Sequence, residues 1–129
     1  MRLILVQIIF VFFVLSNWNF AADVRVEFNR AAGLVRNGKY EEAAELLRQT
    51  AAADDKDAAA RSFAMLGQID VINAKAAADN AEPQTENLTE CLDKAEAHFA
   101  DSLALQDRDD VRKNLEALRA WRAKTTAER

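Results

Sequence analysis

Histidine and cysteine, the two side chains that most often carry covalent or metal chemistry, occur once each, as His98 and Cys91. An imidazole can act as a general base or metal ligand and a thiolate as a nucleophile, but each needs a second group at a defined spacing. His98 falls on the helical side of Lys94 and Asp101, away from Phe99, and no second ligand-type cluster is spaced to join it. We therefore expect His98 to be a solvated helix residue and Cys91 a core thiol, and we predict no metal, no cofactor and no enzymatic activity.

Acidic residues are plentiful, but their positions indicate helix starts rather than acid–base catalysis. They gather at Glu41, Glu42, Asp54, Asp55, Asp109 and Asp110. Carboxylates at such places cap free backbone N–H groups and interact favourably with the helix dipole. The sequence offers no glycine-rich phosphate loop beside them.

Length and composition favour a single all-α domain. The chain has 129 residues with three glycines and one proline, which leaves little turn chemistry for a β or α/β architecture. Its 17 basic and 21 acidic residues give a formal net charge of -4, with both signs interleaved. Because phosphate binding needs a basic face and no run of residues supplies one, we expect no nucleic-acid partner.

Residues 1–22 are typical of an export signal or a membrane anchor. An apolar block from Leu3 to Leu15 follows one arginine, and its 13 residues (15 − 3 + 1) are fewer than the roughly 20 that a spanning helix needs. This length favours a cleaved signal peptide. The small residues Ala21 and Ala22 lack small partners at the outer processing position, so an anchor over residues 3–22 stays open. In either case we expect the remainder to fold in the periplasm or cell envelope.

Apolar residues recur at spacings of three and four along five stretches, which predicts five helices. These are expected from Val24 to Arg36, from about Lys39, from about Ala58, from Thr85 or Asn87, and from about Asp109. Asn37 and Gly38 are expected to end the first helix. The third helix carries its apolar side on Phe63, Leu66, Ile69, Ile72 and Ala76. A loop is expected around Pro83, and the polar tail 124–129 is expected to fray.

Two short motifs resemble the tetratricopeptide repeat, a helix-turn-helix unit of about 34 residues. The stretch "FAMLG", Phe63 to Gly67, is similar to the aromatic-x2-Leu-Gly half of its signature, and "AEAHF", Ala95 to Phe99, is similar to the Ala-x3-Phe half. In an earlier copy Ala31 stands for the glycine, 36 positions (67 − 31) before Gly67. The resemblance implies an antiparallel helix-hairpin superhelix over residues 23–123, with about two repeats and a C-terminal capping helix. A plain antiparallel helical bundle is the alternative.

The resemblance also implies roles for individual residues. Those expected to pack the hairpins together are Ala31, Leu34, Gly38, Tyr40, Ala43, Leu47, Phe63, Leu66, Gly67, Ala95 and Phe99. In this family the first helix of each hairpin lines a concave groove, which would place Arg25, Asn29, Arg36, Arg61, Gln68, Lys75 and Lys113 on it. All seven are basic or amide residues, which favours an acidic segment or a C-terminal carboxylate as the partner. Asp70 stands where the repeat signature has a tyrosine.

The function expected from these features is a non-enzymatic protein–protein interaction scaffold in the cell envelope. Such a protein would be similar to the small exported bacterial repeat proteins that accompany von Willebrand-type domains in aerotolerance operons. The alternative is a membrane-anchored helical bundle that acts by self-association or as a structural envelope component. Contact with the membrane is expected only through the N-terminal segment, and a homo-oligomer is compatible with both hypotheses.

Overall fold

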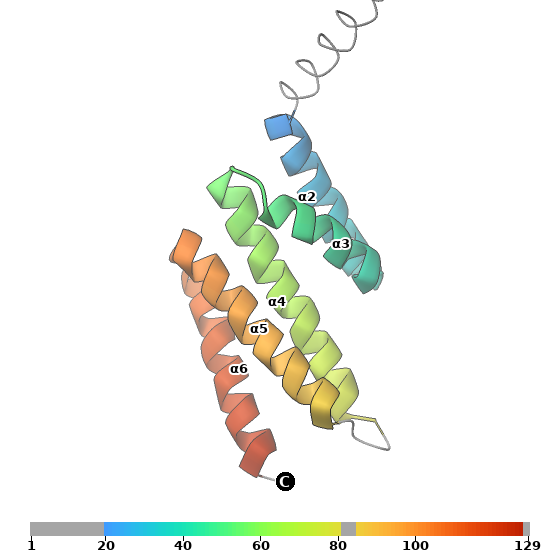
Figure 1. Ribbon diagram of the computed structural model, residues 1–129, viewed down its shortest axis with the longest axis vertical. Coiled ribbons are helices and arrows are strands. Elements are labelled where there is room, and N and C mark those ends of the chain that lie inside the picture. The colour runs from blue at the N-terminus through green and yellow to red at the C-terminus, as the bar shows by residue number, and fades with distance from the viewer. Residues whose placement is uncertain (1–19, 81–84, 128–129) are drawn as a thin grey trace, which may run out of the picture.

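The computed structural model describes residues 20–80 and 85–127, which form helices and connecting turns without a β-strand (Figure 1). The helices are α2 (Phe20–Arg36), α3 (Tyr40–Ala51), α4 (Lys56–Ala78), α5 (Thr85–Leu105) and α6 (Asp109–Ala127). The predicted all-α class is confirmed. The predicted signal or anchor lies almost wholly in residues 1–19, which are outside the described residues, as is Pro83.

The turn between α2 and α3 depends on Gly38, whose φ of 77° lies in the left-handed region that glycine adopts without strain. Two backbone hydrogen bonds close the end of α2, from Gly38 N to Val35 O at 3.0 Å and from Lys39 N to Leu34 O at 2.9 Å. This pair of bonds is the Schellman arrangement. The helix end predicted at Asn37 and Gly38 is therefore present.

Two other helix ends differ from the prediction. Helix α2 begins at Phe20 rather than Val24, inside the segment assigned to the signal or anchor. Helix α6 continues to Ala127, through the first part of the tail that was expected to fray. Neither stretch contains glycine or proline, so nothing in the local sequence stops the helix.

Among residues 20–80 and 85–127, no helix combines the length and the hydropathy required to span a bilayer.

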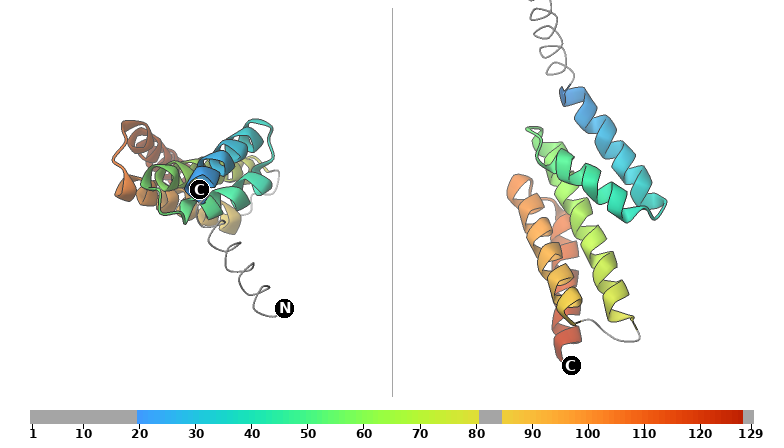
Figure 2. Two further views of the ribbon diagram at one scale, coloured as in Figure 1. Left: turned by 90° about the horizontal axis from the view of Figure 1, so that it is seen from above. Right: turned by 45° about the vertical axis from the view of Figure 1, so that its right-hand side comes forward.

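The helices pack as neighbours in chain order, with α4 at the centre (Figure 1 and Figure 2). Helices α2 and α3 form one hairpin and α4 and α5 a second, while α6 packs against α5. Helix α4 also packs against α2 and α3, so it joins the two hairpins. This order of two hairpins and a final helix agrees with the predicted architecture. Membership of the tetratricopeptide family stays a prediction.

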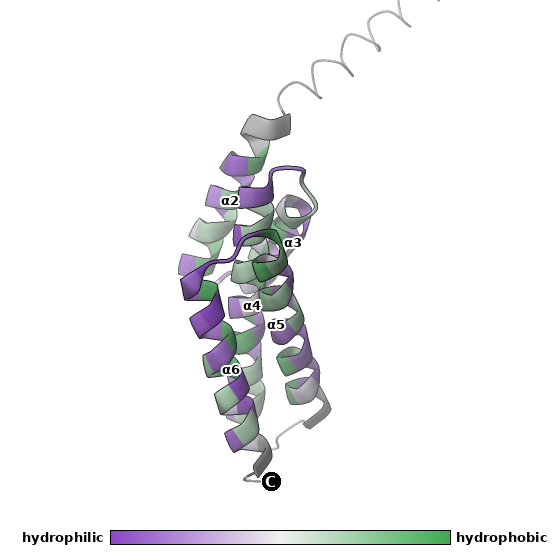
Figure 3. Cartoon of the chain, turned by 90° about the vertical axis from the view of Figure 1, so that its left-hand side faces the viewer, coloured by the Kyte–Doolittle hydropathy of each residue, from purple (hydrophilic) through white to green (hydrophobic). Residues whose placement is uncertain are grey.

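Two hydrophobic clusters meet at α4. The first joins α2, α3 and α4 through the buried residues Ala31, Ala43, Ala44, Leu47, Ala51, Leu66 and Ile69, with Leu34, Tyr40 and Phe63 partly buried against them. The second joins α4, α5 and α6 through Ala74, Leu88, Leu92, Ala95, Phe99, Val111, Leu115 and Leu118. Figure 3 shows hydrophilic and hydrophobic residues alternating along α6, as expected for a helix with one packed side and one solvated side.

Helices α4 and α5 pack closely at Gly67. The Phe99 side chain, only 1% exposed, lies directly over it. A Cβ atom at Gly67 would lie 2.6 Å from Phe99 Cε1 and 2.7 Å from Phe99 Cδ1, closer than real Cβ contacts. Only glycine therefore leaves room for the ring in this position.

Buried hydroxyl groups also join α4 to its neighbours. Thr50 Oγ1 in α3 lies 2.6 Å from Ser62 Oγ in α4, and Ser102 Oγ in α5 donates to Ala60 O in α4 at 2.7 Å. Ser62 Oγ also donates to Ala58 O within α4, at 2.6 Å. Since each hydroxyl has a partner, its burial carries no penalty for an unsatisfied polar group.

Replacing Gly67 with alanine is expected to lower the free energy of unfolding by about 1–2 kcal/mol, because the added methyl group overpacks the core against Phe99 at a cost in the upper part of about 1–3 kcal/mol. The loss should outweigh the roughly 1 kcal/mol that alanine gains over glycine inside a helix. Urea denaturation followed by circular dichroism measures the difference.

Gly33→Ala in α2 is the matched control. A Cβ atom at Gly33 meets only Arg36 Nη2, at an ordinary distance of 3.8 Å. This variant is expected to be more stable by about 0.5–1 kcal/mol. An equal gain in stability from both substitutions would contradict the close crossing at Gly67.

Candidate functional site

A groove with a volume of about 520 Å³ lies between α4 and α6. Its lining consists of Gln68, Val71, Ile72 and Lys75 from α4, Phe99 from α5, and Asn114, Ala117, Leu118 and Trp121 from α6. Helices α4 and α6 both pack against α5, which explains why an α5 side chain contributes to the lining between them. Most of the lining is apolar, and its volume falls in the range of about 300–1,000 Å³ that is typical of ligand sites.

Ile72 shows how the groove differs from the predicted core. The apolar spacing of the third predicted helix placed Ile72 and Ala76 on its buried side, but Ile72 is half-buried and lines the groove, and Ala76 is exposed. The reason is that α6 packs on α5 and not directly over this side of α4. An apolar side chain is thereby left facing open space.

The seven residues predicted to face a groove do not form one lining. Gln68 and Lys75 line the groove between α4 and α6. Lys113 is exposed and directly precedes the lining residue Asn114. The other four lie outside this lining, at Arg25, Asn29, Arg36 and Arg61.

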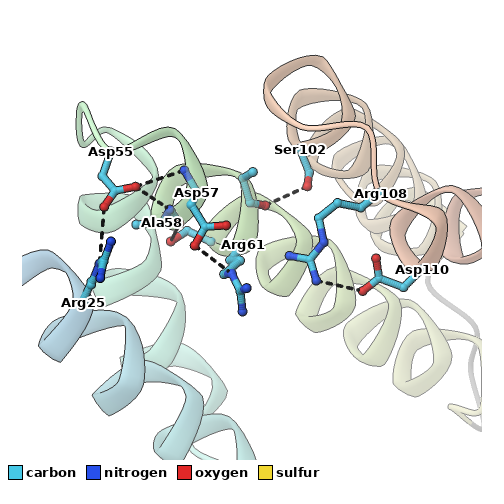
Figure 4. Close-up of polar contacts among 10 residues, drawn as sticks. Arg25, Asp55, Asp57, Ala58, Arg61, Ser102, Arg108 and Asp110 are labelled. Carbon is cyan, nitrogen blue, oxygen red and sulfur yellow. Dashed lines mark hydrogen bonds and ion pairs between the residues drawn. The ribbon is translucent and has the colours of Figure 1, made fainter.

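Arg25 and Arg61 lie near the start of α4, and each faces an acidic residue of the same chain (Figure 4). Arg25 Nε is 3.7 Å from Asp55 Oδ2, and Arg61 Nε is 3.0 Å from Asp57 Oδ2. Asp55 also caps α4, because its Oδ1 accepts hydrogen bonds from the N–H groups of Asp57 and Ala58. An external carboxylate would have to compete with these internal partners for both arginines.

The prediction that His98 is a solvated helix residue is wrong. Its Nδ1 lies 2.5 Å from Asp70 Oδ2, and the two side chains are 26% and 14% exposed. The imidazole also stacks on Phe63, with ring centroids 6.2 Å apart. His98 adjoins Phe99 in sequence and Asp70 lies three positions after Gly67, so the close crossing brings the pair together. The helical position of His98 within its own helix could not reveal a partner on another helix.

His98 and Asp70 line a second pocket, also of about 520 Å³. The lining consists of Tyr40, Glu41, Ala44, Glu45 and Arg48 from α3, Leu66, Ile69, Asp70 and Asn73 from α4, and Lys94 and His98 from α5. Most of these side chains are polar or charged, in contrast to the apolar groove. Sequence reasoning missed this pocket. Its polar residues lie on three different helices, which pack together through small residues where they cross. The spacing of polar residues within one helix does not indicate that packing.

Cys91 is partly buried and packs against the second hydrophobic cluster. Burial is the main cause that raises the pKa of its thiol, which disfavours the nucleophilic thiolate at neutral pH. Within the part of the chain that the structure describes, no group of three or more His, Cys, Asp or Glu side chains could hold a metal ion.

Arg61→Gln is expected to raise the pKa of the Asp57 carboxyl toward its ordinary value of 3.8, because the hydrogen bond from Arg61 is the main cause that lowers it. A carboxyl with a lowered folded-state pKa stabilises the fold above its ordinary pKa, and this contribution is lost as the pH falls through the lowered value. Carboxyl ¹³C NMR titration of the unsubstituted protein and of Arg61→Gln measures the change in the Asp57 pKa. Arg48→Gln is the control, since Arg48 pairs with Glu45. An Asp57 pKa that is equal in all three proteins would contradict the pairing.

The chain was compared with protein-family models, curated proteins and solved structures, and none of them matches it. Its function is therefore inferred from the sequence, the groove between α4 and α6, and the polar pocket on α3, α4 and α5.

Proposed function

We propose that the protein is a non-enzymatic protein–protein interaction scaffold, exported to the cell envelope, that holds a segment of a partner protein in the groove between α4 and α6. The observation that carries this proposal is the lining of the groove, where apolar side chains from α4 and α6 face open space beside Gln68, Lys75 and Asn114. Open apolar recesses with a few polar groups at the edge are typical of interaction sites. The resemblance to tetratricopeptide hairpins also favours α4 and α6 as the helices that bind a partner. In that resemblance both correspond to the first helix of a repeat, which lines the binding groove.

The chemistry of the lining favours an acidic amphipathic segment as the occupant. Val71, Ile72 and Trp121 are half-buried and offer a surface for a large apolar side chain, whose full burial is worth about 1.5–3 kcal/mol. Lys75 forms no ion pair with another residue in the described ranges, so its ammonium group is available to a carboxylate of the partner. An amphipathic helix laid into a groove combines these two contacts.

Location in the envelope is supported by the N-terminal sequence. Cell fractionation of the native organism is expected to place the protein outside the cytoplasm, and mass spectrometry is expected to show either loss of about the first 22 residues or an intact chain in the membrane fraction. The first result indicates a cleaved signal peptide and the second an anchor. An intact chain in the cytoplasmic fraction would contradict export.

Binding in the groove can be followed by the fluorescence of Trp121. The sequence holds two tryptophans, so a Trp18→Phe chain keeps Trp121 as its only one. The probe is a synthetic amphipathic peptide of about 16 residues, with leucine at every third or fourth position and glutamate between. We expect it to change the Trp121 emission and to bind at least about tenfold more tightly than the same peptide with lysine in place of glutamate, a difference of about 1.4 kcal/mol.

Two variants in the Trp18→Phe background locate this binding. Ile72→Glu is expected to abolish it, and Lys75→Glu to weaken the acidic peptide by an amount that shrinks at high salt. Arg48→Glu is the charge-matched control, because Arg48 lines the other pocket and should leave the affinity unchanged. Circular dichroism checks that each variant folds. Equal affinity for both peptides, or equal losses from Lys75→Glu and Arg48→Glu, would sink the assignment to this groove.

A further inference from the structure

The geometry points to a second binding site: we propose that the polar pocket on α3, α4 and α5 takes a guanidinium or ammonium group, presented by an arginine or lysine side chain of a partner protein. The site is separate from the groove between α4 and α6. Ile69, Asp70 and Asn73 of α4 line the pocket, whereas Gln68 and Ile72 line the groove. At about 100° of rotation per residue, Asp70 lies about 200° around the helix from Gln68. The two sites therefore open on opposite sides of α4.

Three acidic residues and two permanently charged bases line the pocket. The charged lining residues are the acids Glu41, Glu45 and Asp70 and the bases Arg48, Lys94 and, when protonated, His98. Arg48 Nη1 is 3.0 Å from Glu45 Oε2, and Lys94 Nζ is 2.9 Å from Glu90 Oε1, outside the lining. Each of these two cations is thus already paired with a carboxylate of its own helix. Glu41 forms no ion pair with another described residue, so its charge is available to an incoming cation.

Tyr40 and Asn73 add neutral groups that suit the same ligand. Neither the Tyr40 hydroxyl nor the Asn73 side-chain amide forms a hydrogen bond within the described part of the chain. The face of a phenol ring attracts a cation, and an amide oxygen accepts a hydrogen bond from an N–H group. A guanidinium group can satisfy a carboxylate and an amide oxygen together, because its donors form a planar fork.

The pair of His98 and Asp70 holds part of this lining in place. His98 Nδ1 forms a hydrogen bond with Asp70 Oδ2, and the imidazole stacks on Phe63. Asp70 Oδ1 has no partner among the described residues, and none of their fully buried side-chain oxygens lacks one, so Oδ1 retains some exposure. It supplies a further acceptor in the lining, and because the His98 contact fixes the Asp70 side chain, less entropy is lost when a cation binds.

Proton NMR with N-acetyl-arginine amide as the probe tests this inference on the full chain. His98 is the only histidine, so its imidazole signals need no further assignment. At constant pH, these signals are expected to shift and to saturate at millimolar probe. N-acetyl-citrulline amide has a similar shape without the charge and is expected to cause no saturable shift. Saturation by both compounds alike would overturn the proposal.

Glu41→Gln removes the available charge from an exposed position and is expected to raise the Kd for N-acetyl-arginine amide by about fivefold or more. Glu116→Gln, exposed on α6 and outside the pocket lining, is the control and is expected to leave the Kd unchanged. An unchanged Kd in Glu41→Gln would overturn the proposal. So would His98 signals that change on dilution of the protein alone, since a second copy would then fill the pocket. Trp121 emission reports only on the groove between α4 and α6, and the His98 signals report on the polar pocket. A negative result at one site is therefore distinguishable from a negative result at the other.

Discussion

The approach of the Phe99 ring to the backbone at Gly67 is the constraint on which both surfaces depend. Because no side chain separates them, α4 and α5 cross closely enough for His98 to reach Asp70 beside the polar pocket. The same ring contributes to the lining of the groove between α4 and α6. A wider crossing would leave a void under Phe99 and part His98 from Asp70, so packing and both sites would change together.

Small residues and hydroxyl groups define the other helix crossings. Ala31, Ala43 and Ala60 are fully buried, although an alanine side chain contributes little hydrophobic free energy by itself. Its small size lets two helix backbones approach, and the buried hydroxyls then provide directed bonds such as that from Ser102 to Ala60. The arrangement of the helices thus depends on proximity and direction more than on the volume of any one side chain.

Sequence reasoning succeeded where a local signal decides the structure. Apolar spacing located the helices, and the backbone freedom of Gly38 and the capping oxygen of Asp55 act within a few residues of themselves. It failed where the outcome depends on another helix. Ile72 has the period of a core residue yet lines the groove, and His98 has the period of a solvated residue yet bonds to Asp70. For the same reason, only two of the seven predicted groove residues line the groove.

The central position of α4 limits how its sequence can diverge. A surface helix has one solvated side on which substitutions accumulate with little effect on the fold. Helix α4 packs against α2, α3 and α5, and its remaining sides contribute to two openings of different chemistry. Substitutions on the outward sides of α2 and α6 are expected to disturb fewer contacts than substitutions in α4. In a related chain that kept this architecture but lacked one of the two openings, the residues of α4 that line that opening would be expected to differ.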